Sequence, residues 1–213
     1  MESPLRDIAP HGLTLFETLR FEPRLGPVRG ALHLARMARG AAALGWVFDA
    51  QRAAEMLEQA GDDAPLRLRL ELTAQGDLGL TTSPYLVQTG PWRVGLAEAR
   101  IKAGDPWRAI KTSNRAVYDQ TRAALPDTMD EVLVLNERGT IAEGTITNVF
   151  VQRGAHLVTP PLADGCLPGV LRETLLADGT AAEGALTPSD LRAAGLFFVG
   201  NSLRGLIPAY FVE

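Results

Sequence analysis

The stretch LRLRLELT at residues 66–73 alternates strictly between leucine and a polar side chain. In a β-strand this period of two places every leucine on one face and leaves the other face to arginine, glutamate and threonine. A strand with one apolar and one polar face is typical of an antiparallel sheet that packs against a core on one side only. The sequence therefore predicts a half-buried, antiparallel strand over residues 66–73.

Further strands and helices are predicted on both sides of this stretch. Toward the N-terminus, LTLFETLRF at 13–21 indicates another strand, and helical spacing of apolar residues predicts helices over 30–44 and 50–60. Toward the C-terminus the same criteria predict helices over 115–125, 169–177 and 188–194, and strands at 77–81, 84–88, 92–98, 131–136, 140–142, 147–152, 156–159, 196–200 and 206–212.

Strands outnumber the predicted helices and do not alternate with them regularly. This pattern favours the α+β class over a doubly wound parallel sheet. The turn-rich segment QTGP at 88–91 is the best candidate for a linker. We therefore expect a small α/β domain over residues 1–88 and a larger, β-rich domain over residues 89–213.

Composition excludes several classes of protein. Of the 213 residues, 46% are hydrophobic and 22% are charged, as in an ordinary globular protein and unlike a disordered chain. The single cysteine, Cys166, can form no internal disulfide and cannot alone build a zinc site, so we expect neither secretion nor a metal. No apolar run approaches ~18 residues, and the N-terminus is unlike a signal peptide. The formal net charge of −4, with no basic block, argues against nucleic-acid binding, and a cytoplasmic protein with no membrane partner is expected.

Lysine is nearly absent from this chain. Of the 21 lysine and arginine residues, only Lys102 and Lys111 are lysines. Arginine can replace lysine on a surface but does not lose its proton, so it cannot act as an amine nucleophile or base. A retained lysine is therefore a candidate for amine chemistry, the plain alternative being a leftover surface residue. Lys102 lies beside a Gly-Asp-Pro turn and is expected in solvent, whereas Lys111 lies between an apolar strand-like end and a predicted helix.

Other residues supply a carboxylate and a candidate anion site. Glu143, in TIAEGTITNVF, lies between a short strand and a turn, and its burial would require a cationic or N–H partner. Gly169 begins a predicted helix, whose first N–H groups and dipole suit an anion. The turn GNSLRG adds three polar residues directly after an apolar strand: Asn201, Ser202 and Arg204. Together with Lys111, the set contains an amine, a carboxylate and a phosphate-type site.

In this order along the chain, the segments resemble those of the fold-type IV pyridoxal-phosphate enzymes, which comprise class IV aminotransferases and 4-amino-4-deoxychorismate lyases. The resemblance is carried by LHLARM with Arg36, IKTSNR, EGTITNVFV and LVTPPLADGCLPGVLRETLL, and is extended by FETLR at 16–20 and VGNSLRGLIPA at 199–209. It covers nearly the whole chain. It implies a small α/β N-terminal domain, a β-barrel-like C-terminal domain, pyridoxal 5′-phosphate bound between the domains, and a homodimer.

Residue roles follow from the resemblance by position. Lys111 would form the Schiff base with the cofactor and transfer protons, and Glu143 would keep the pyridine nitrogen protonated. The phosphate would be held by the Arg36 fork, by the N–H groups of Gly169 and Val170, and by Ser202 or Asn201. Further candidates for lining the site or contacting substrate are Thr18, Arg115, Tyr118 and Arg204, whereas His33 and Cys166 are expected to serve packing or local hydrogen bonding.

Departures from the family pattern bear on the reaction. Leu171 stands where many of the aminotransferases carry a hydroxyl residue, and Ala116 stands where the branched-chain enzymes have a tyrosine. The Asn114-Arg115 pair instead resembles the lyases, and the first domain lacks the usual Gly-Asp-Gly before FETLR. The favoured interpretation is an aminodeoxychorismate lyase, which makes 4-aminobenzoate and pyruvate for folate biosynthesis. The alternatives are a class IV aminotransferase for branched-chain or D-amino acids, and a protein that has kept the fold without the chemistry.

Overall fold

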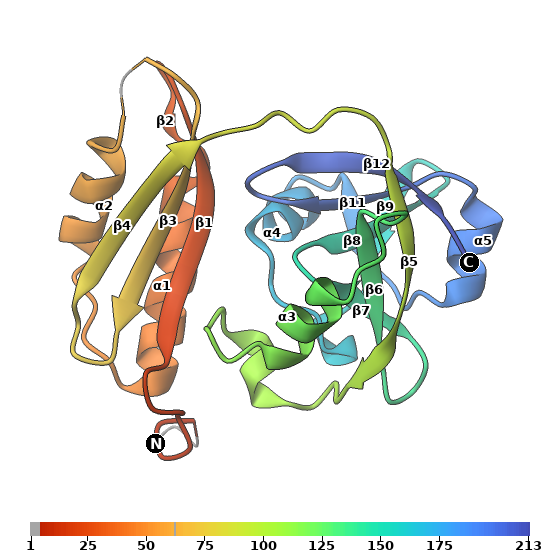
Figure 1. Cartoon of the computed structure of the whole chain (residues 1–213), viewed down its shortest axis with the longest axis horizontal. Coiled ribbons are helices and arrows are strands. Elements are labelled where there is room, and N and C mark those ends of the chain that lie inside the picture. The colour runs from red at the N-terminus through yellow and green to blue at the C-terminus, as the bar shows by residue number, and fades with distance from the viewer. Residues whose placement is uncertain (1–4, 62) are drawn as a thin grey trace. The chain divides into compact units, whose positions relative to one another are not determined.

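The computed structural model describes residues 5–61 and 63–213, and the chain divides into two compact units (Figure 1). The first unit comprises Met1–Val87 and Ile110–Asn114, and the second comprises Gln88–Ala109 and Arg115–Glu213. Residues 110–114 belong to the first unit although they follow residues 88–109 of the second. Each unit therefore consists of two segments of the chain.

The first unit is a four-stranded antiparallel sheet with two helices on one face (Figure 1). The strand order is β2-β1-β3-β4, and the elements are β1 (Thr14–Glu22), β2 (Gly26–Pro27), α1 (Gly30–Leu44), α2 (Ala50–Glu58), β3 (Leu66–Thr73) and β4 (Leu78–Pro84). In β3, Leu68, Leu70 and Leu72 are fully buried, and the strand pairs antiparallel with β1 and β4. The prediction from the alternating stretch is confirmed. The strand expected at 84–88 is wrong, because β4 ends at Pro84 and Leu86 and Val87 beyond it are exposed.

Local signals determine where the two helices begin and end. Gly45 ends α1 in the left-handed conformation, at φ 67°, and the N–H of Trp46 donates to Ala41 O at 2.9 Å. The side chain of Asp49 begins α2 by accepting the N–H of Arg52. The glycine signal explains why α1 ends at its predicted residue.

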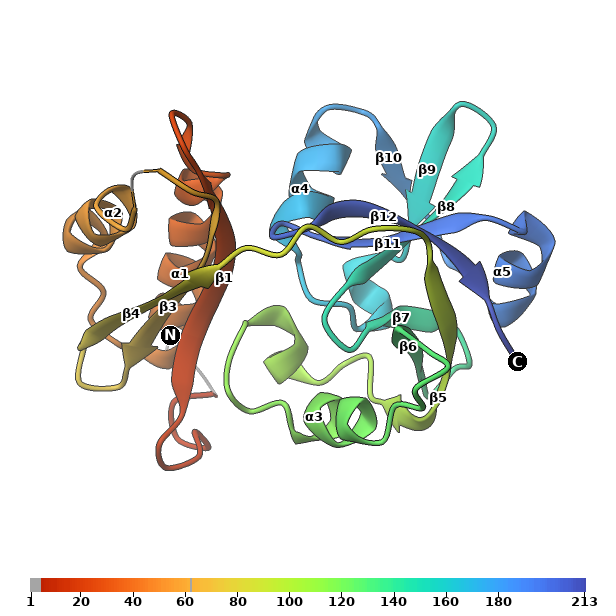
Figure 2. The same cartoon turned by 45° about the horizontal axis from the view of Figure 1, so that its top comes forward.

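The second unit is built on an eight-stranded curled sheet (Figure 2). The strand order is β10-β9-β8-β11-β12-β5-β6-β7, and the strands are β5 (Trp92–Ile101), β6 (Glu131–Asn136), β7 (Ile141–Gly144), β8 (Asn148–Arg153), β9 (His156–Thr159), β10 (Ala181–Glu183), β11 (Phe197–Asn201) and β12 (Gly205–Phe211). The helices are α3 (Ala116–Ala123), α4 (Val170–Ala177) and α5 (Pro188–Ala194), with short 3-10 turns at Pro106–Ala109 and Leu162–Asp164. Most pairs are antiparallel, but β5 runs parallel to β6 and β12, and β9 parallel to β10. The predicted α+β class with a barrel-like second part is confirmed.

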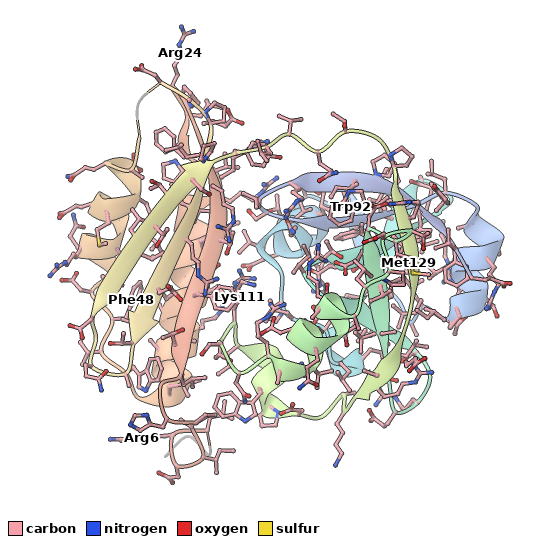
Figure 3. All side chains as sticks on the ribbon, viewed as in Figure 1. Arg6, Arg24, Phe48, Trp92, Lys111 and Met129 are labelled. Atoms are coloured by element: carbon pink, nitrogen blue, oxygen red, sulfur yellow. The ribbon has the colours of Figure 1, made fainter. Side chains whose placement is uncertain are left out.

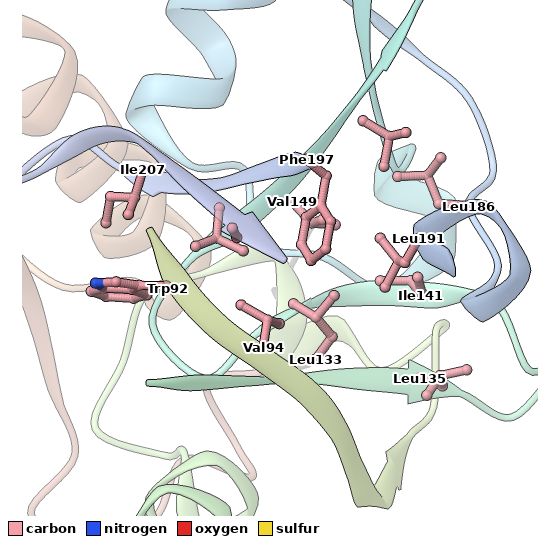
Figure 4. Packing of buried hydrophobic residues seen from close by; sticks show 13 residues of the cluster. Trp92, Val94, Leu133, Leu135, Ile141, Val149, Leu186, Leu191, Phe197 and Ile207 are labelled. Carbon is pink, nitrogen blue, oxygen red and sulfur yellow. The ribbon is translucent and has the colours of Figure 1, made fainter. Parts of the chain in front are cut away.

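The curl of the sheet surrounds an apolar core (Figure 4). Its members come from six strands, the segment before α5 and α5 itself: Trp92, Val94, Leu133, Leu135, Ile141, Val149, Val151, Leu186, Leu191, Phe197, Val199, Ile207 and Ala209. Two smaller clusters form elsewhere in the unit, one including Tyr118 of α3 and the other backed by Leu175 and Leu176 of α4. Among the described residues, no helix has both the length and the apolar character needed to cross a membrane.

Substituting Phe197 tests this core. Phe197 is fully buried, so Phe197→Ala should lower the free energy of unfolding of the second unit by about 3–5 kcal/mol. Phe198 is the matched control, because it is its neighbour on β11 and is only partly buried. Urea unfolding followed by circular dichroism measures both variants, and an equal loss in the two would contradict the assigned faces of β11.

Candidate active site

Lys111 lies on a short segment that runs along the beginning of β1 (Figure 3). The N–H of Phe16 donates to Lys111 O at 3.2 Å, and the N–H of Ser113 donates to Thr14 O at 2.9 Å. The Nζ atom of Lys111 lies 4.5 Å from the centroid of the Phe16 ring, within range of a cation–π contact. Main-chain hydrogen bonds on both sides of Thr112 therefore hold this segment, and with it the base of the Lys111 side chain, against β1.

A buried carboxylate, Glu17, lies at the centre of the first unit. It belongs to β1 and faces the helices, and only 1% of its surface is exposed. Arg36 of α1 donates from Nε to Oε1 at 2.8 Å and from Nη2 to Oε2 at 2.5 Å. His33, one turn earlier on α1, approaches Oε2 with Nδ1 at 2.6 Å. We refer to Glu17, His33 and Arg36 as the Glu17 cluster.

Charge and hydrogen bonding keep this carboxylate ionised. Burial alone would raise the pKa of Glu17, but the charge and hydrogen bonds of Arg36, with those of His33, lower it to about 2. Burial also lowers the pKa of His33, against the opposing effect of Glu17, and the charges of Arg36 and Lys111 lower it further. His33 is therefore neutral near pH 7 and donates its Nδ1 proton to Glu17. The expected local hydrogen bond of His33 is thus found, and its partner is Glu17.

The sheet face opposite the helices carries several cations. Thr18 lies on this face of β1 directly opposite Arg69 of β3, with Arg20 opposite Arg67. The Cζ atom of Arg69 lies 4.1 Å from the centroid of the Phe16 ring, and its Nη2 donates to Glu71 at 2.8 Å. Thr18, the predicted substrate residue of this unit, is therefore placed among arginines on a partly exposed surface.

In the second unit, Glu143 is a buried carboxylate with partners for both oxygens. The hydroxyl of Tyr118 donates to Oε1 at 2.6 Å, and the N–H of Leu167 donates to Oε2 at 3.0 Å. Burial and the charge of Glu143 raise the pKa of Tyr118 above its ordinary range, so Tyr118 remains a donor. A carboxylate has about four acceptor positions and can accept from more than two donors. Tyr118 thus supports Glu143, a role that its position in the sequence alone did not reveal.

A second buried carboxylate orders the loop that follows Glu143. Glu131, fully buried at the start of β6, accepts hydrogen bonds from the N–H and hydroxyl of Thr145, the N–H of Ile146 and the hydroxyl of Thr147. Arg115 binds the same loop from α3, with Nη2 donating to Thr145 O at 2.9 Å while Nε contacts Asp119. Arg115, predicted as a substrate contact, therefore holds the loop and α3 together.

The predicted anion site at α4 is built around a glycine. Gly169 precedes α4, whose first N–H groups have no partner within the helix. A Cβ atom on Gly169 would lie 1.9 Å from Oδ1 of Asn148, so a larger residue cannot occupy this position without moving Asn148. Asn148 is itself tied to the same loop through its donation to Leu167 O at 3.2 Å. The N–H of Gly169 donates to Leu167 O at 2.8 Å, so the first N–H of α4 without an acceptor in the helix is that of Val170.

The turn between β11 and β12 contains the other predicted residues. Asn201 uses both ends of its amide within the protein, because Nδ2 donates to Ile146 O and Oδ1 accepts the N–H of Arg204. Ser202 is buried, and the guanidinium of Arg204 lies 5.8 Å from the centroid of the Trp92 ring. Asn201 therefore shapes the turn that presents Ser202 and Arg204.

Cys166 is buried, and burial together with the nearby charge of Glu143 raises the pKa of its thiol to about 12, which disfavours the reactive thiolate. Within the part of the chain that the structure describes, no group of three or more His, Cys, Asp and Glu side chains could hold a metal ion.

Sequence reasoning missed Glu17 and Glu131 as organising residues, although the strand pattern carried a signal for one of them. Glu17 interrupts the series Leu15, Leu19 and Phe21 on the core face of β1, so an acid at that register position implies a buried donor nearby. Glu131 begins an apolar strand, and nothing local identifies its partners, which lie 14–16 residues further along the chain.

The chain belongs to the class IV aminotransferase family, whose sequence model matches residues 14–210. It is 43% identical to a Mesorhizobium loti protein provisionally named an amino-acid aminotransferase, and the two structures superpose with a TM-score of 0.90 over 94% of this chain and 100% of that one. It is 29% identical, over 89% of this chain and 86% of the relative, to a Schizosaccharomyces pombe protein provisionally named an aminodeoxychorismate lyase. A protein from Legionella pneumophila, provisionally named 4-amino-4-deoxychorismate lyase, is 23% identical and matches 94% of this chain and 83% of its own at a TM-score of 0.80, which shows the shared fold alone.

Membership of this family confirms the predicted resemblance, the predicted fold class and the status of the chain as an enzyme. It also confirms pyridoxal phosphate as the cofactor, since enzymes of the family depend on it.

The neutral state of His33 predicts a pH dependence of stability. Its pKa in the folded protein lies below the ordinary 6.5, so as the pH falls below about 6.5 the unfolded chain binds a proton that the folded chain does not. The free energy of unfolding should therefore decrease on acidification, by at most about 1.4 kcal/mol per pH unit from this residue.

His33→Asn tests this expectation, because asparagine can donate to Glu17 but does not titrate. Urea unfolding at pH 7.5 and pH 5.5 should show a smaller loss of stability in the variant than in the natural protein. The same loss in both proteins would mean that His33 is not held neutral.

Proposed function

We propose that this protein is a pyridoxal-phosphate-dependent aminodeoxychorismate lyase, which converts 4-amino-4-deoxychorismate to 4-aminobenzoate and pyruvate in folate biosynthesis. The observation that carries the choice of reaction is the similarity to the S. pombe relative, which extends over most of both chains. The absence of the tyrosine of the branched-chain enzymes supports it, since Ala116 stands at that position. The expected homodimer and cytoplasmic location stay predictions.

The residues present fit the cofactor. Glu143 is a buried carboxylate, a group that can accept a pyridine N–H, and α4 begins at Val170 with N–H groups that have no acceptor within the helix and suit an anion. Arg36 offers a planar fork of five N–H donors, so one edge can bind Glu17 while another meets a phosphate. We assign the phosphate to Arg36, to the N–H of Val170 and to Ser202, with Asn201 shaping the turn. The predicted contact from the Gly169 N–H would require this group to leave Leu167 O, to which it donates at 2.8 Å.

Lys111 and Glu143 have different roles in the proposed reaction. Pyridoxal phosphate, when bound, supplies an aldehyde for amine exchange and an electron-accepting ring. Lys111 would hold the cofactor through this aldehyde until the substrate amine takes its place, and the freed amine would then remove the proton from the carbon that bears the substrate amine. Glu143, held by Tyr118 and Leu167, would accept the N–H of the pyridine and so keep the pyridine protonated.

The remaining steps require positioning more than further chemistry. In the substrate, the bond between the carbon ring and the enolpyruvyl oxygen breaks, and this carbon ring becomes aromatic. The released enolpyruvate gains a proton to become pyruvate. The substrate carries two carboxylates, which suits the arginine-rich sheet face around Thr18 and Arg69 in the first unit and the half-buried guanidinium of Arg204 in the second. Arg115 contributes by holding the 145–147 loop.

The second candidate is a class IV aminotransferase for branched-chain or D-amino acids. It is favoured by the 43% identity to the M. loti protein, which is provisionally named an amino-acid aminotransferase. The two reactions differ in their need for an acceptor, since a transaminase turns over only when a 2-oxo acid takes the amino group. Product analysis therefore separates them.

Replacing each lysine in turn tests the proposed chemistry. With 4-amino-4-deoxychorismate, the protein should release 4-aminobenzoate and pyruvate in equal amounts, and Lys111→Ala should lower this rate by at least about 10³-fold because the amine is lost. Lys102→Ala is the matched control, since Lys102 is the other lysine of the chain, and it should keep the natural rate. Fluorescence of 4-aminobenzoate and a coupled pyruvate assay measure both products.

Transfer of the amino group from L-glutamate or D-alanine to a 2-oxo acid, without formation of 4-aminobenzoate, would replace the lyase by the aminotransferase. Binding of pyridoxal phosphate without turnover of any of these substrates would contradict both.

A further inference from the structure

Glu17 lies on the buried face of β1, at a position where an apolar side chain is expected. Its neighbours on the same face of β1, Leu15 and Leu19, are buried core residues, and Glu17 pairs across the sheet with the fully buried Leu70. A buried ion pair is often no more stabilising than apolar residues of similar volume, because both charges lose their hydration. The burial of Glu17 therefore points to a use other than stability.

The geometry of the pair points to that use. The two oxygens of Glu17 meet Nε and Nη2 of Arg36 at 2.8 and 2.5 Å, a bidentate arrangement that sets both the direction and the plane of the guanidinium. His33 adds a third donor to Oε2 and so fixes the carboxylate itself. Arg36 is a long side chain that would otherwise sample several rotamers, and 7% of its surface remains exposed.

We propose that Glu17 is a positioning residue that holds the Arg36 guanidinium in the orientation that binds the phosphate of the cofactor. The inference rests on the role given to Arg36 under the proposed function. Ordering Arg36 in advance removes an entropic cost that phosphate binding would otherwise carry. It also prevents the arginine from turning away when no phosphate is bound.

Charge and orientation have opposite effects here, which makes the inference testable. Glu17 reduces the positive potential at Arg36, so loss of its charge alone would strengthen the attraction of Arg36 for a phosphate. Loss of the bidentate contact would weaken binding, because the guanidinium would no longer be held. The proposal states that orientation dominates.

The experiment compares pyridoxal phosphate with pyridoxal, which lacks the phosphate. Dissociation constants of both compounds are measured on the cofactor-free protein by absorbance titration, and their ratio defines the phosphate preference. Glu17→Gln should lower this preference by at least about tenfold, the effect of losing one charge-assisted hydrogen bond, with little change in pyridoxal affinity. Folding is checked by circular dichroism.

Two further variants complete the test. Glu17→Asp keeps the charge but shortens the side chain, so it should also lower the preference, and it replaces the glutamine variant if that protein does not fold. His33→Asn keeps the fork between Glu17 and Arg36 and should retain most of the phosphate preference. An unchanged or increased preference in the folded Glu17 variants would overturn the proposal.

Arg36→Lys separates this inference from the role of Arg36 itself. A reduced preference in Arg36→Lys together with a natural preference in the Glu17 variants would leave Arg36 as the phosphate residue and remove Glu17. A natural preference in Arg36→Lys would instead show that Arg36 does not bind the phosphate, and the assignment under the proposed function would fail with it.

Discussion

A buried carboxylate must be surrounded by donors, and this requirement organises both units of the molecule. In the first unit, Glu17 draws Arg36 and His33 of α1 onto the sheet. In the second, Glu131 gathers the N–H and hydroxyl groups of the 145–147 loop, and Glu143 is met by Tyr118 and Leu167. Each carboxylate ties together elements that are distant in sequence, so the candidate site depends on these contacts for its shape.

Local patterns were sufficient for much of the fold. Residues 66–73 and 131–136 form strands within their predicted bounds, α1 ends where its glycine indicates, and α5 begins where its sequence indicates, because alternation, a glycine C-cap and a capping box act within a few residues. The short strands β2 and β10 were missed, since two or three residues are too few to show a period. The strand expected at 84–88 was wrong because Leu86 and Val87 are apolar but exposed.

In the candidate site, too, some features could be predicted from the sequence and others could not. Lys111 and Glu143 could be singled out from the scarcity of lysine and from the motifs around them. Their surroundings could not be predicted: the return of residues 110–114 to β1, the Tyr118–Glu143 hydrogen bond and the Glu17 cluster all join residues far apart in the chain. Such pairings follow from sheet register and helix packing, which periodicity does not specify.

The central claim is that Lys111 supplies the reactive amine, and a chain with two lysines allows a direct measurement. The protein is loaded with pyridoxal phosphate, reduced with borohydride and digested, and the modified peptide is identified by mass spectrometry. The account predicts a stoichiometric cofactor adduct on Lys111 and none on Lys102. An adduct on Lys102, or no adduct in protein that has bound the cofactor, would contradict it.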